Sequence, residues 1–501
     1  MMNPAIPQDA QTTSTDDHNW QGDFHIWLPL LIWTWVLAIV FRDRFVSDWD
    51  GFDYAANVIN NVPTALGLGR ALFLAYNQIL WKMAHRWFDL PPEQSYLVLK
   101  YGVIAMSGPT VVGVYALYKE LTASRLAACF GTLMVVFSPL FIIYSGRGMS
   151  EIPGLLMLAW SLWWMIRSLR IKRMGGYFAA VAIFGLSANM REFAPFYLPI
   201  VPLAAIIYGI SWKRWLPATI FAVLAMLAGA IFWSLYWPEY YIPAVKNWLQ
   251  LSALESEKNP VTLGNLRFMV EYGFRCSAAA FVIAPFALIE GSRQFLKNTP
   301  RRVLFLLGLL GLTADLALSR THYLSYSPRY LLTGLIGLAA ISGWFLAELI
   351  TRFRGWKAAI PAFIAIGLTV ANLITFYPYF HKDVLAAQVA REYLAKITDL
   401  PNDAVFIVGA HTPLVNFYRR SGARKFWKVI PAGAGWPDDK LDREINDYLS
   451  RGIPVFVDFD ENLWNPGQIN NREAAGLQMI KRVYRLDLVR NPSLYRISRS
   501  G

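Results

Sequence analysis

The sequence predicts an all-α polytopic membrane protein with about eleven transmembrane helices, followed by a small C-terminal α/β domain. Its 501 residues are 55% hydrophobic and 16% charged, whereas soluble domains carry roughly 25% charged residues. Apolar runs of about 20 residues, the length that crosses a bilayer, recur between residues 24 and 379. Compact loops rich in lysine and arginine occur at every second connection, as is typical of cytoplasmic loops. These three observations place the chain among the integral membrane proteins.

The transmembrane domain is expected over residues 24–380. The apolar runs that we interpret as spans are 24–41, 96–117, 126–144, 152–166, 177–188, 195–210, 215–237, 274–289, 303–318, 330–350 and 358–379. Because the basic loops mark the cytoplasmic side, parity places residues 1–23 inside, as a tail expected to be disordered. The same parity places the first long loop, residues 42–95, and the segment 381–501 outside. We therefore expect a multi-pass protein of the inner (cytoplasmic) membrane whose functional site and C-terminal domain face outward.

Two segments outside the spans have patterns of their own. The stretch 66–88 is apolar but interrupted by charged and amide side chains, which predicts a juxtamembrane helix that lies in the interface and does not cross. Residues 381–501 predict an extracytoplasmic α/β domain that serves as a lid or docking surface. The elements expected in this domain are strands 405–409 and 454–460 and helices 441–452 and 471–484.

Charge and cysteine content exclude several classes of function. The net charge of +13 is explained by the basic loops, and no basic stripe interleaved with exposed aromatic residues indicates nucleic-acid binding. Cys129 and Cys276 both lie in apolar runs, so we interpret them as small buried side chains that form neither a disulfide framework nor a cysteine metal site.

Ionisable side chains gather at the outer ends of the spans. Ion-coupled transporters tend to place such residues near the midplane, on broken helices related by internal repeats. Charges concentrated at one membrane face instead favour an enzyme that acts on a lipid headgroup there. The candidate site residues are Asp48, Asp50, Asp53, Tyr54, Arg147, Glu151, Arg191, Glu192, Arg320, His322, Tyr326 and Arg329.

These residue types permit one chemistry in particular. Asp50 can act as a general base toward an acceptor hydroxyl or amine, while arginines hold a phosphate by charge-assisted hydrogen bonds. A phosphate leaving group needs its charge stabilised more than it needs a proton, so no second carboxylic acid is required. The pattern therefore predicts displacement of a lipid phosphate from a sugar.

Four short runs resemble a known superfamily in their order and spacing. The run 50–55 (DGFDYA) is similar to the Asp-Glu-x-x-Tyr-Ala motif of the GT-C polyprenyl-phosphate-sugar glycosyltransferases, and 150–153 (SEIP) resembles their second acidic outer-loop motif. Residues 191–192 resemble the loop after span five, and 328–332 (PRYLL) the Arg-Tyr-Leu-Leu-Pro element. The resemblance covers about residues 24–380 and is strongest to the branch with bacterial protein O-mannosyltransferases and lipid A aminoarabinose transferases.

The resemblance implies a GT-C-like fold, a polyprenyl-phosphate sugar donor, a lipid, glycan or protein acceptor, and transfer with inversion at the anomeric carbon. Asp50 matches the catalytic aspartate and Arg329 matches a phosphate-side arginine. Gly51 stands where many relatives have glutamate, which weakens a metal site or second acid there, and Thr333 replaces the usual proline. We predict no cofactor firmly and leave a divalent metal open. Membrane lipids are expected partners.

Each assignment has an alternative that the sequence leaves open. Asp50 could cap the following helix, and Glu151 could serve only the dipole of its own helix. The outer arginines could anchor the protein to lipid headgroups. The function could also be that of a lipid-linked glycan transporter (flippase), or of a metal-dependent oligosaccharide transferase that uses a lipid pyrophosphate.

Overall fold

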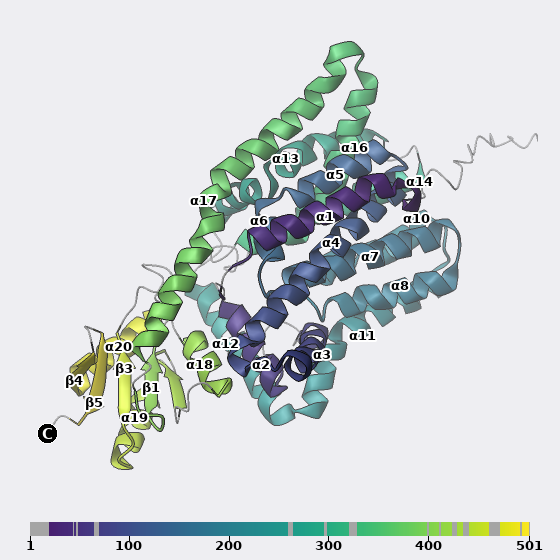
Figure 1. The fold of residues 1–501 in the computed structure, drawn as a ribbon. Coiled ribbons are helices and arrows are strands. Elements are labelled where there is room, and N and C mark those ends of the chain that lie inside the picture. The colour runs from purple at the N-terminus through teal and green to yellow at the C-terminus, as the bar shows by residue number, and fades with distance from the viewer. Residues whose placement is uncertain are drawn as a thin grey trace, which may run out of the picture.

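A helical bundle and a small α/β domain make up the molecule in the computed structural model, and the long helix α17 leads from one to the other (Figure 1). The described residues are 20–43, 45–46, 49–64, 70–258, 264–294, 298–319, 328–397, 400–409, 412–422, 428–433, 440–459, 471–490 and 493–499. The expected disorder of the tail therefore concerns a segment that, up to residue 19, lies outside them.

Each predicted span coincides with one helix or with two consecutive helices of the bundle, and three further α-helices in the described part of the chain lie between predicted spans. The helices of the bundle are α1 (Phe24–Val40), α2 (Trp49–Asn60), α3 (Ala71–Phe88), α4 (Ser95–Thr122), α5 (Arg125–Val136), α6 (Pro139–Ser145), α7 (Glu151–Arg170), α8 (Met174–Ser187), α9 (Ala194–Tyr197), α10 (Ile200–Ile207), α11 (Trp212–Tyr236), α12 (Pro238–Lys258), α13 (Gly264–Gln294), α14 (Thr299–Ser319), α16 (Leu332–Arg352) and α17 (Ile360–Lys396). The short 3-10 helix η4 (Pro328–Leu331) precedes α16.

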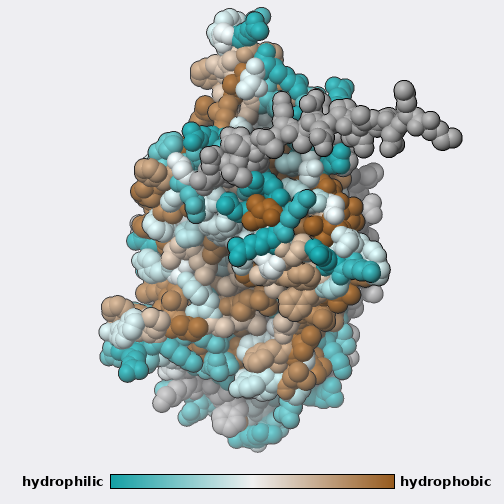
Figure 2. All heavy atoms as spheres, turned by 90° about the vertical axis from the view of Figure 1, so that its right-hand side faces the viewer, coloured by the Kyte–Doolittle hydropathy of each residue, from teal (hydrophilic) through white to brown (hydrophobic). Residues whose placement is uncertain are grey.

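Eight helices in the described part of the chain are long and apolar enough to cross a membrane, or nine if α5 and α6, bent by 64°, form one broken span. Two shorter apolar helices, Met174–Ser187 and Ala194–Ile207, coincide with two more of the predicted spans. The fold is thus that of a multi-pass membrane protein, while a count of eleven crossings stays a prediction. Figure 2 shows hydrophobic side chains spread over much of one face, as expected of a surface that contacts lipid.

Small residues allow the central helices to pack closely, as in many membrane bundles. A Cβ atom at Gly337 of α16 would lie 2.3 Å from the carbonyl oxygen of Leu307 in α14, so only glycine fits there. Tyr197 and Tyr118 then donate hydrogen bonds to the carbonyl oxygens of Thr333 (2.7 Å) and Ile336 (2.8 Å). These contacts hold the start of α16, and with it η4, in place.

A buried ion pair holds the segment that leads to α2. Lys100 of α4 lies 2.7 Å from the carboxylate of Asp43, and its Nζ also donates to the carbonyl oxygens of Asp43 and Phe45 at 2.6 and 2.7 Å. Both side chains of the pair are 3% exposed. The segment just before α2 is thus fixed to the N-terminal part of α4.

The end of the N-terminal tail is ordered, which corrects the prediction of disorder for these residues. Gln21–Asp23 form a 3-10 helix, and Asp23 is fully buried. Its carboxylate accepts a hydrogen bond from Tyr115 (2.9 Å) and pairs with Arg125 at 2.6 Å. The pairing compensates the negative charge of this buried carboxylate.

The C-terminal domain contains a five-stranded sheet in the order β2-β1-β3-β5-β4. Its elements are β1 (Val405–Val408), α18 (Thr412–Arg420), β2 (Lys428–Pro431), α19 (Lys440–Ser450), β3 (Val455–Asp458), α20 (Asn471–Val483), β4 (Arg485–Arg490) and β5 (Leu494–Ser498). The central strand β1 is parallel to β2 and β3, while β5 pairs antiparallel with both β3 and β4. The two expected strands and two expected helices are confirmed. The other three strands have weaker hydrophobic patterns.

The boundary expected at residue 380 lies inside a helix. No glycine or proline occurs from residue 379 to 396, so α17 continues as a single helix to Lys396. At the far end of this helix, α18 packs against α2 (Figure 1). Arg420 donates to the side chain of Asn57 at 2.9 Å, and the rings of Phe417 and Phe52 lie 5.6 Å apart. The C-terminal domain therefore covers the helix that carries Asp50.

Candidate active site

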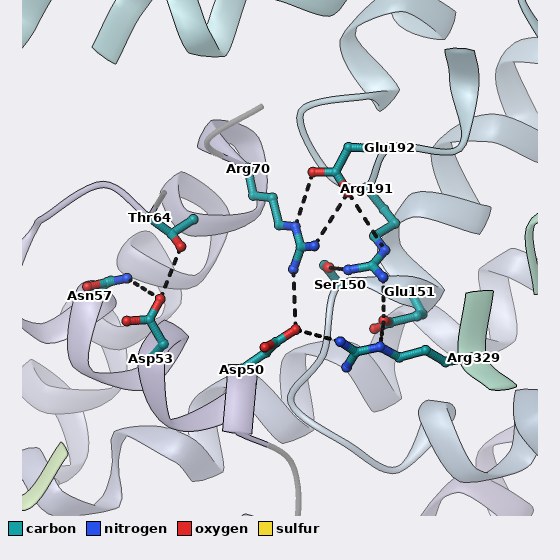
Figure 3. A network of polar contacts seen from close by, with 10 residues as sticks. All are labelled: Asp50, Asp53, Asn57, Thr64, Arg70, Ser150, Glu151, Arg191, Glu192 and Arg329. Carbon is teal, nitrogen blue, oxygen red and sulfur yellow. Dashed lines mark hydrogen bonds and ion pairs between the residues drawn. The ribbon is translucent and has the colours of Figure 1, made fainter. Parts of the chain in front are cut away.

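Five segments that are far apart in the sequence bring six charged side chains together (Figure 3). The segments are the first turn of α2, the residue before α3, the start of α7, the loop between α8 and α9, and η4. The six residues are Asp50, Arg70, Glu151, Arg191, Glu192 and Arg329. All six lie at one end of the bundle. Five of the six, all except Arg70, are predicted site residues, and the structure thus brings them together.

Asp50 lies between two arginines of this cluster. Its Oδ2 atom accepts a hydrogen bond from Nη2 of Arg329 at 2.8 Å and lies 3.9 Å from Nη1 of Arg70. Burial disfavours the charged carboxylate, but the positive charges of Arg329, Arg70 and Arg191 outweigh it and lower the pKa of Asp50 below its ordinary value. A residue that only caps a helix binds the backbone N–H groups of its own first turn. The carboxylate of Asp50 instead binds guanidinium groups of other segments, which disfavours the capping alternative.

Glu151 joins two arginines at the base of the cluster. Its Oε1 lies 3.2 Å from Nη2 of Arg191 and 3.5 Å from Nε of Arg329. Glu151 is fully buried, Arg191 is 2% exposed and Arg329 8% exposed. A headgroup anchor would extend toward the membrane surface, so this burial disfavours that alternative for both arginines. Ser150 adds a hydrogen bond of 3.5 Å with Nη1 of Arg191.

Arg70 is a member of the cluster that sequence analysis missed. Its guanidinium contacts both carboxylate oxygens of Glu192, at 3.3 and 3.4 Å, and lies 5.3 Å from the ring centroid of Tyr54. The residue is 5% exposed and adopts φ of 40°, a left-handed conformation that is uncommon outside glycine. The sequence offered only one signal, an arginine at the edge of the apolar stretch that was interpreted as an interface helix.

One nitrogen of Arg70 has capacity for a further acceptor. Nη1 is buried and has no hydrogen-bond partner within the described residues, because Asp50 at 3.9 Å is too distant for one. A buried guanidinium N–H normally finds an acceptor. This N–H group of Arg70 lies on the side of Asp50 and could donate a hydrogen bond to a bound anion.

Asp53 lies one turn after Asp50 and has different partners. Its Oδ2 accepts hydrogen bonds from Asn57 (2.8 Å) and Thr64 (3.0 Å). Burial raises the pKa of Asp53, because it outweighs the two hydrogen bonds and the positive charge of Arg420. Asp53 therefore belongs to a second polar region, separate from the arginine cluster, as Figure 3 also shows.

The other predicted residues are placed as follows. Tyr54 is fully buried and packs edge-on against Phe73, with ring centroids 5.0 Å apart. The guanidinium of Arg70 lies over its ring. Arg147 is half-buried with its guanidinium 5.0 Å from the ring centroid of Tyr144, outside the cluster drawn in Figure 3. The predicted site residues outside the described part of the chain are Asp48, Arg320, His322 and Tyr326.

The backbone at Gly51 explains its departure from the glutamate of the resembled motif. A Cβ atom there would lie 2.8 Å from Cγ1 of Val46, so a longer side chain would require the preceding loop to move. Within the described residues, no group of three or more His, Cys, Asp and Glu side chains is placed to hold a metal ion. The chemistry available from these residues is that of carboxylates and guanidinium groups.

Fold and site together define a class: a polytopic α-helical membrane protein with a cluster of carboxylates and arginines in its helical bundle and a small α/β domain. Residues 93–237, from α4 to α11, match the sequence profile of the family described as dolichyl-phosphate-mannose-protein mannosyltransferase. A search of curated proteins gave no significant match.

Two solved structures have a similar fold. The chain is similar to ArnT from Cupriavidus metallidurans bound to undecaprenyl phosphate, with a TM-score of 0.53 and 12% identity over 96% of this chain and 98% of that chain. The apo state of that protein matches with a TM-score of 0.50 and 12% identity, over 95% and 98% of the two chains. The chain therefore shares its fold with these structures over nearly its whole length.

Proposed function

We propose that this protein is a membrane glycosyltransferase that transfers a sugar from a polyprenyl-phosphate donor to an acceptor at the extracytoplasmic face. The observation that carries the proposal is the placement of one carboxylate, Asp50, between Arg329 and Arg70, with an N–H of Arg70 that has no acceptor among the described residues. The similarity to a structure with bound undecaprenyl phosphate supports a lipid-linked donor. The basic loops support the outward orientation of the site.

The residues divide the work of a single displacement. The acceptor oxygen forms a bond to the anomeric carbon of the donor while the bond from that carbon to the phosphate oxygen breaks. The leaving phosphate takes the bonding electrons, and the guanidinium groups of Arg329 and Arg70 stabilise its charge. The acceptor proton passes to Asp50. One displacement gives inversion at the anomeric carbon.

Donor binding also prepares the base. The cluster contains three carboxylates and three guanidinium groups, so a phosphate must compete with Asp50 for Arg329 and Arg70. When the phosphate takes these donors, the positive field on Asp50 is partly neutralised and the carboxylate becomes more basic. The acceptor proton is thus accepted after the donor is in place.

Purified full-length protein in lipid nanodiscs, given a panel of polyprenyl-phosphate sugars and candidate acceptors, is expected to form a new glycosidic bond and release polyprenyl phosphate. Inversion is checked by NMR of the anomeric proton in the product. Movement of a lipid-linked glycan across vesicles without a new bond would instead identify a flippase. Activity with only pyrophosphate-linked donors, lost on chelation of divalent metal, would identify the metal-dependent transferase.

The pH dependence follows from the charges around Asp50. Because its pKa is lowered, Asp50 stays ionised as the pH falls through the ordinary carboxyl range, and activity is lost only below that range. Arg70→Gln removes one of the positive charges and is expected to move the acidic limb of the profile to higher pH. The profile is that of kcat/KM for the donor, which reports the donor-free protein, because a bound phosphate would itself change the charge around Asp50. Weaker donor binding lowers this profile at every pH and does not move its acidic limb.

Arg86→Gln is the matched control for this shift. Arg86 lies exposed at the other end of α3, and its replacement should leave the acidic limb unchanged. An acidic limb that stays in place in Arg70→Gln would show that Asp50 is not the group whose protonation limits the rate.

A further inference from the structure

A cavity lies on the side of Asp50 that faces away from the arginine cluster. It has a volume of about 340 Å³ and lies between α2, α12 and α18. Its walls are formed by Asp50, Phe52, Asp53, Ala56, Asn57, Thr64, Tyr240, Thr412, Pro413, Asn416, Phe417 and Arg420. A cavity of this size holds a group about as large as one or two sugar rings. Asp50 therefore borders two different environments.

The cavity differs from the arginine cluster in its charge. Of its lining residues, two are carboxylates and one is an arginine, and none is lysine. Arg420 also donates to the side chain of Asn57 at 2.9 Å. A phosphate or carboxylate placed here would meet Asp50 and Asp53, and like charges at short range are unfavourable. The lining therefore disfavours an anionic group.

The remaining polar groups suit neutral hydroxyls. Asn416 supplies an amide that both donates and accepts hydrogen bonds. The side chains of Asn57, Thr64 and Thr412 already donate to Asp53 or to backbone carbonyl oxygens, and their oxygens keep capacity to accept from a hydroxyl. The carboxylate of Asp53 adds acceptor oxygens for a sugar hydroxyl. Tyr240 provides an aromatic surface for the C–H face of a sugar ring.

We infer that this cavity binds the acceptor as a neutral, hydroxyl-rich sugar residue, and that α18 of the C-terminal domain selects it. The inference rests on the proposed function, because it assigns the hydroxyl that gives its proton to Asp50. On one side of Asp50, Arg70 and Arg329 bind the phosphate of the donor. On the other side, the acceptor binds in the cavity next to α18. The C-terminal domain is then part of the acceptor site as well as a cover.

Asn416→Ala tests this assignment. The variant removes one amide from α18, and the KM for a neutral acceptor is expected to rise about five- to tenfold, as for the loss of one or two hydrogen bonds. The rate at which the donor is hydrolysed by water, measured without acceptor, separates an effect on the acceptor from an effect on the donor. Asn446→Ala, on α19 of the same domain, is the matched control and should alter neither quantity.

The probes are methyl glycosides and the same glycosides carrying a phosphate group. Binding to the full-length protein in nanodiscs is measured by saturation-transfer NMR, and transfer is measured with labelled donor. Neutral glycosides are expected to bind and accept, with the signal reduced in Asn416→Ala, while the phosphorylated forms bind at least tenfold more weakly.

The outcomes separate this inference from the proposed function. Transfer to a phosphorylated lipid or to a serine-containing peptide, with a KM indifferent to Asn416→Ala, would overturn the neutral sugar site and leave the transferase standing. Binding of neutral glycosides that depends on Asn416, without transfer from any polyprenyl donor, would support the sugar site and overturn the transferase. Equal binding of neutral and phosphorylated glycosides would contradict the charge argument directly.

Discussion

Replacing Asp50 with asparagine is expected to reduce sugar transfer by a factor of about 10² to 10⁴, the usual contribution of a positioned general base. Asparagine has nearly the same shape and still accepts a hydrogen bond from Arg329, but it cannot take the acceptor proton. The measurement is kcat at saturating donor and acceptor in the purified full-length protein.

Donor affinity distinguishes a base from a residue that only holds the donor. In Asp50→Asn the phosphate no longer competes with a carboxylate for Arg329 and Arg70, so the donor should bind at least as tightly as in the wild type. Asp89→Asn, an exposed carboxylate at the end of α3, serves as control and should retain full activity. Full activity in Asp50→Asn would remove Asp50 as the base.

The second large effect is expected on stability, from Glu151→Gln. Glu151 is fully buried and compensates two guanidinium groups, at 3.2 Å from Arg191 and 3.5 Å from Arg329. Removing one partner of a buried ion pair leaves an uncompensated charge, which costs about 3–5 kcal/mol in the free energy of unfolding. The loss is measured as a lower midpoint of thermal unfolding, followed by the fluorescence of the chain's 20 tryptophans.

Glu192→Gln is the matched comparison, because it makes the same change at a side chain that is 25% exposed. Water compensates part of the charge there, so the unfolding midpoint should fall less than in Glu151→Gln. A double variant with Arg191→Gln should lose less stability than the sum of the two single variants, since the two groups are coupled. A Glu151→Gln protein that unfolds at the wild-type temperature would show that the pair contributes no net stability.

The sequence predicted part of the cluster because each member lies at a recognisable position along the chain. Asp50, Glu151, Arg191 and Arg329 stand next to apolar runs in the order of a known motif set. Arg70 has the same kind of location, but the polar interruptions around it were explained by an interface helix. Its role became visible only through Glu192, 122 residues away in the sequence, and through its place beside Asp50.

The acceptor side of the site has no comparable signal in the sequence. Asn416 and Arg420 lie on an amphipathic helix of an α/β domain, where polar residues are expected on the exposed face. They line the cavity only because α18 docks on α2, with Phe417 packed against Phe52. Docking of this kind depends on the shapes of two distant surfaces.

The amino-acid pattern alone determined the membrane class, the positions of the apolar helices and the strand–helix character of the C-terminal segment. These features follow from hydrophobic runs and periodicities within 20 or so neighbouring residues, which decide what a segment buries. Tertiary structure decided which carboxylate pairs with which guanidinium, and it formed the cavity between α2, α12 and α18 beside Asp50. Arg329 reaches Asp50 across 279 residues of chain. Such contacts are set by the packing of helices against one another, which no local pattern encodes.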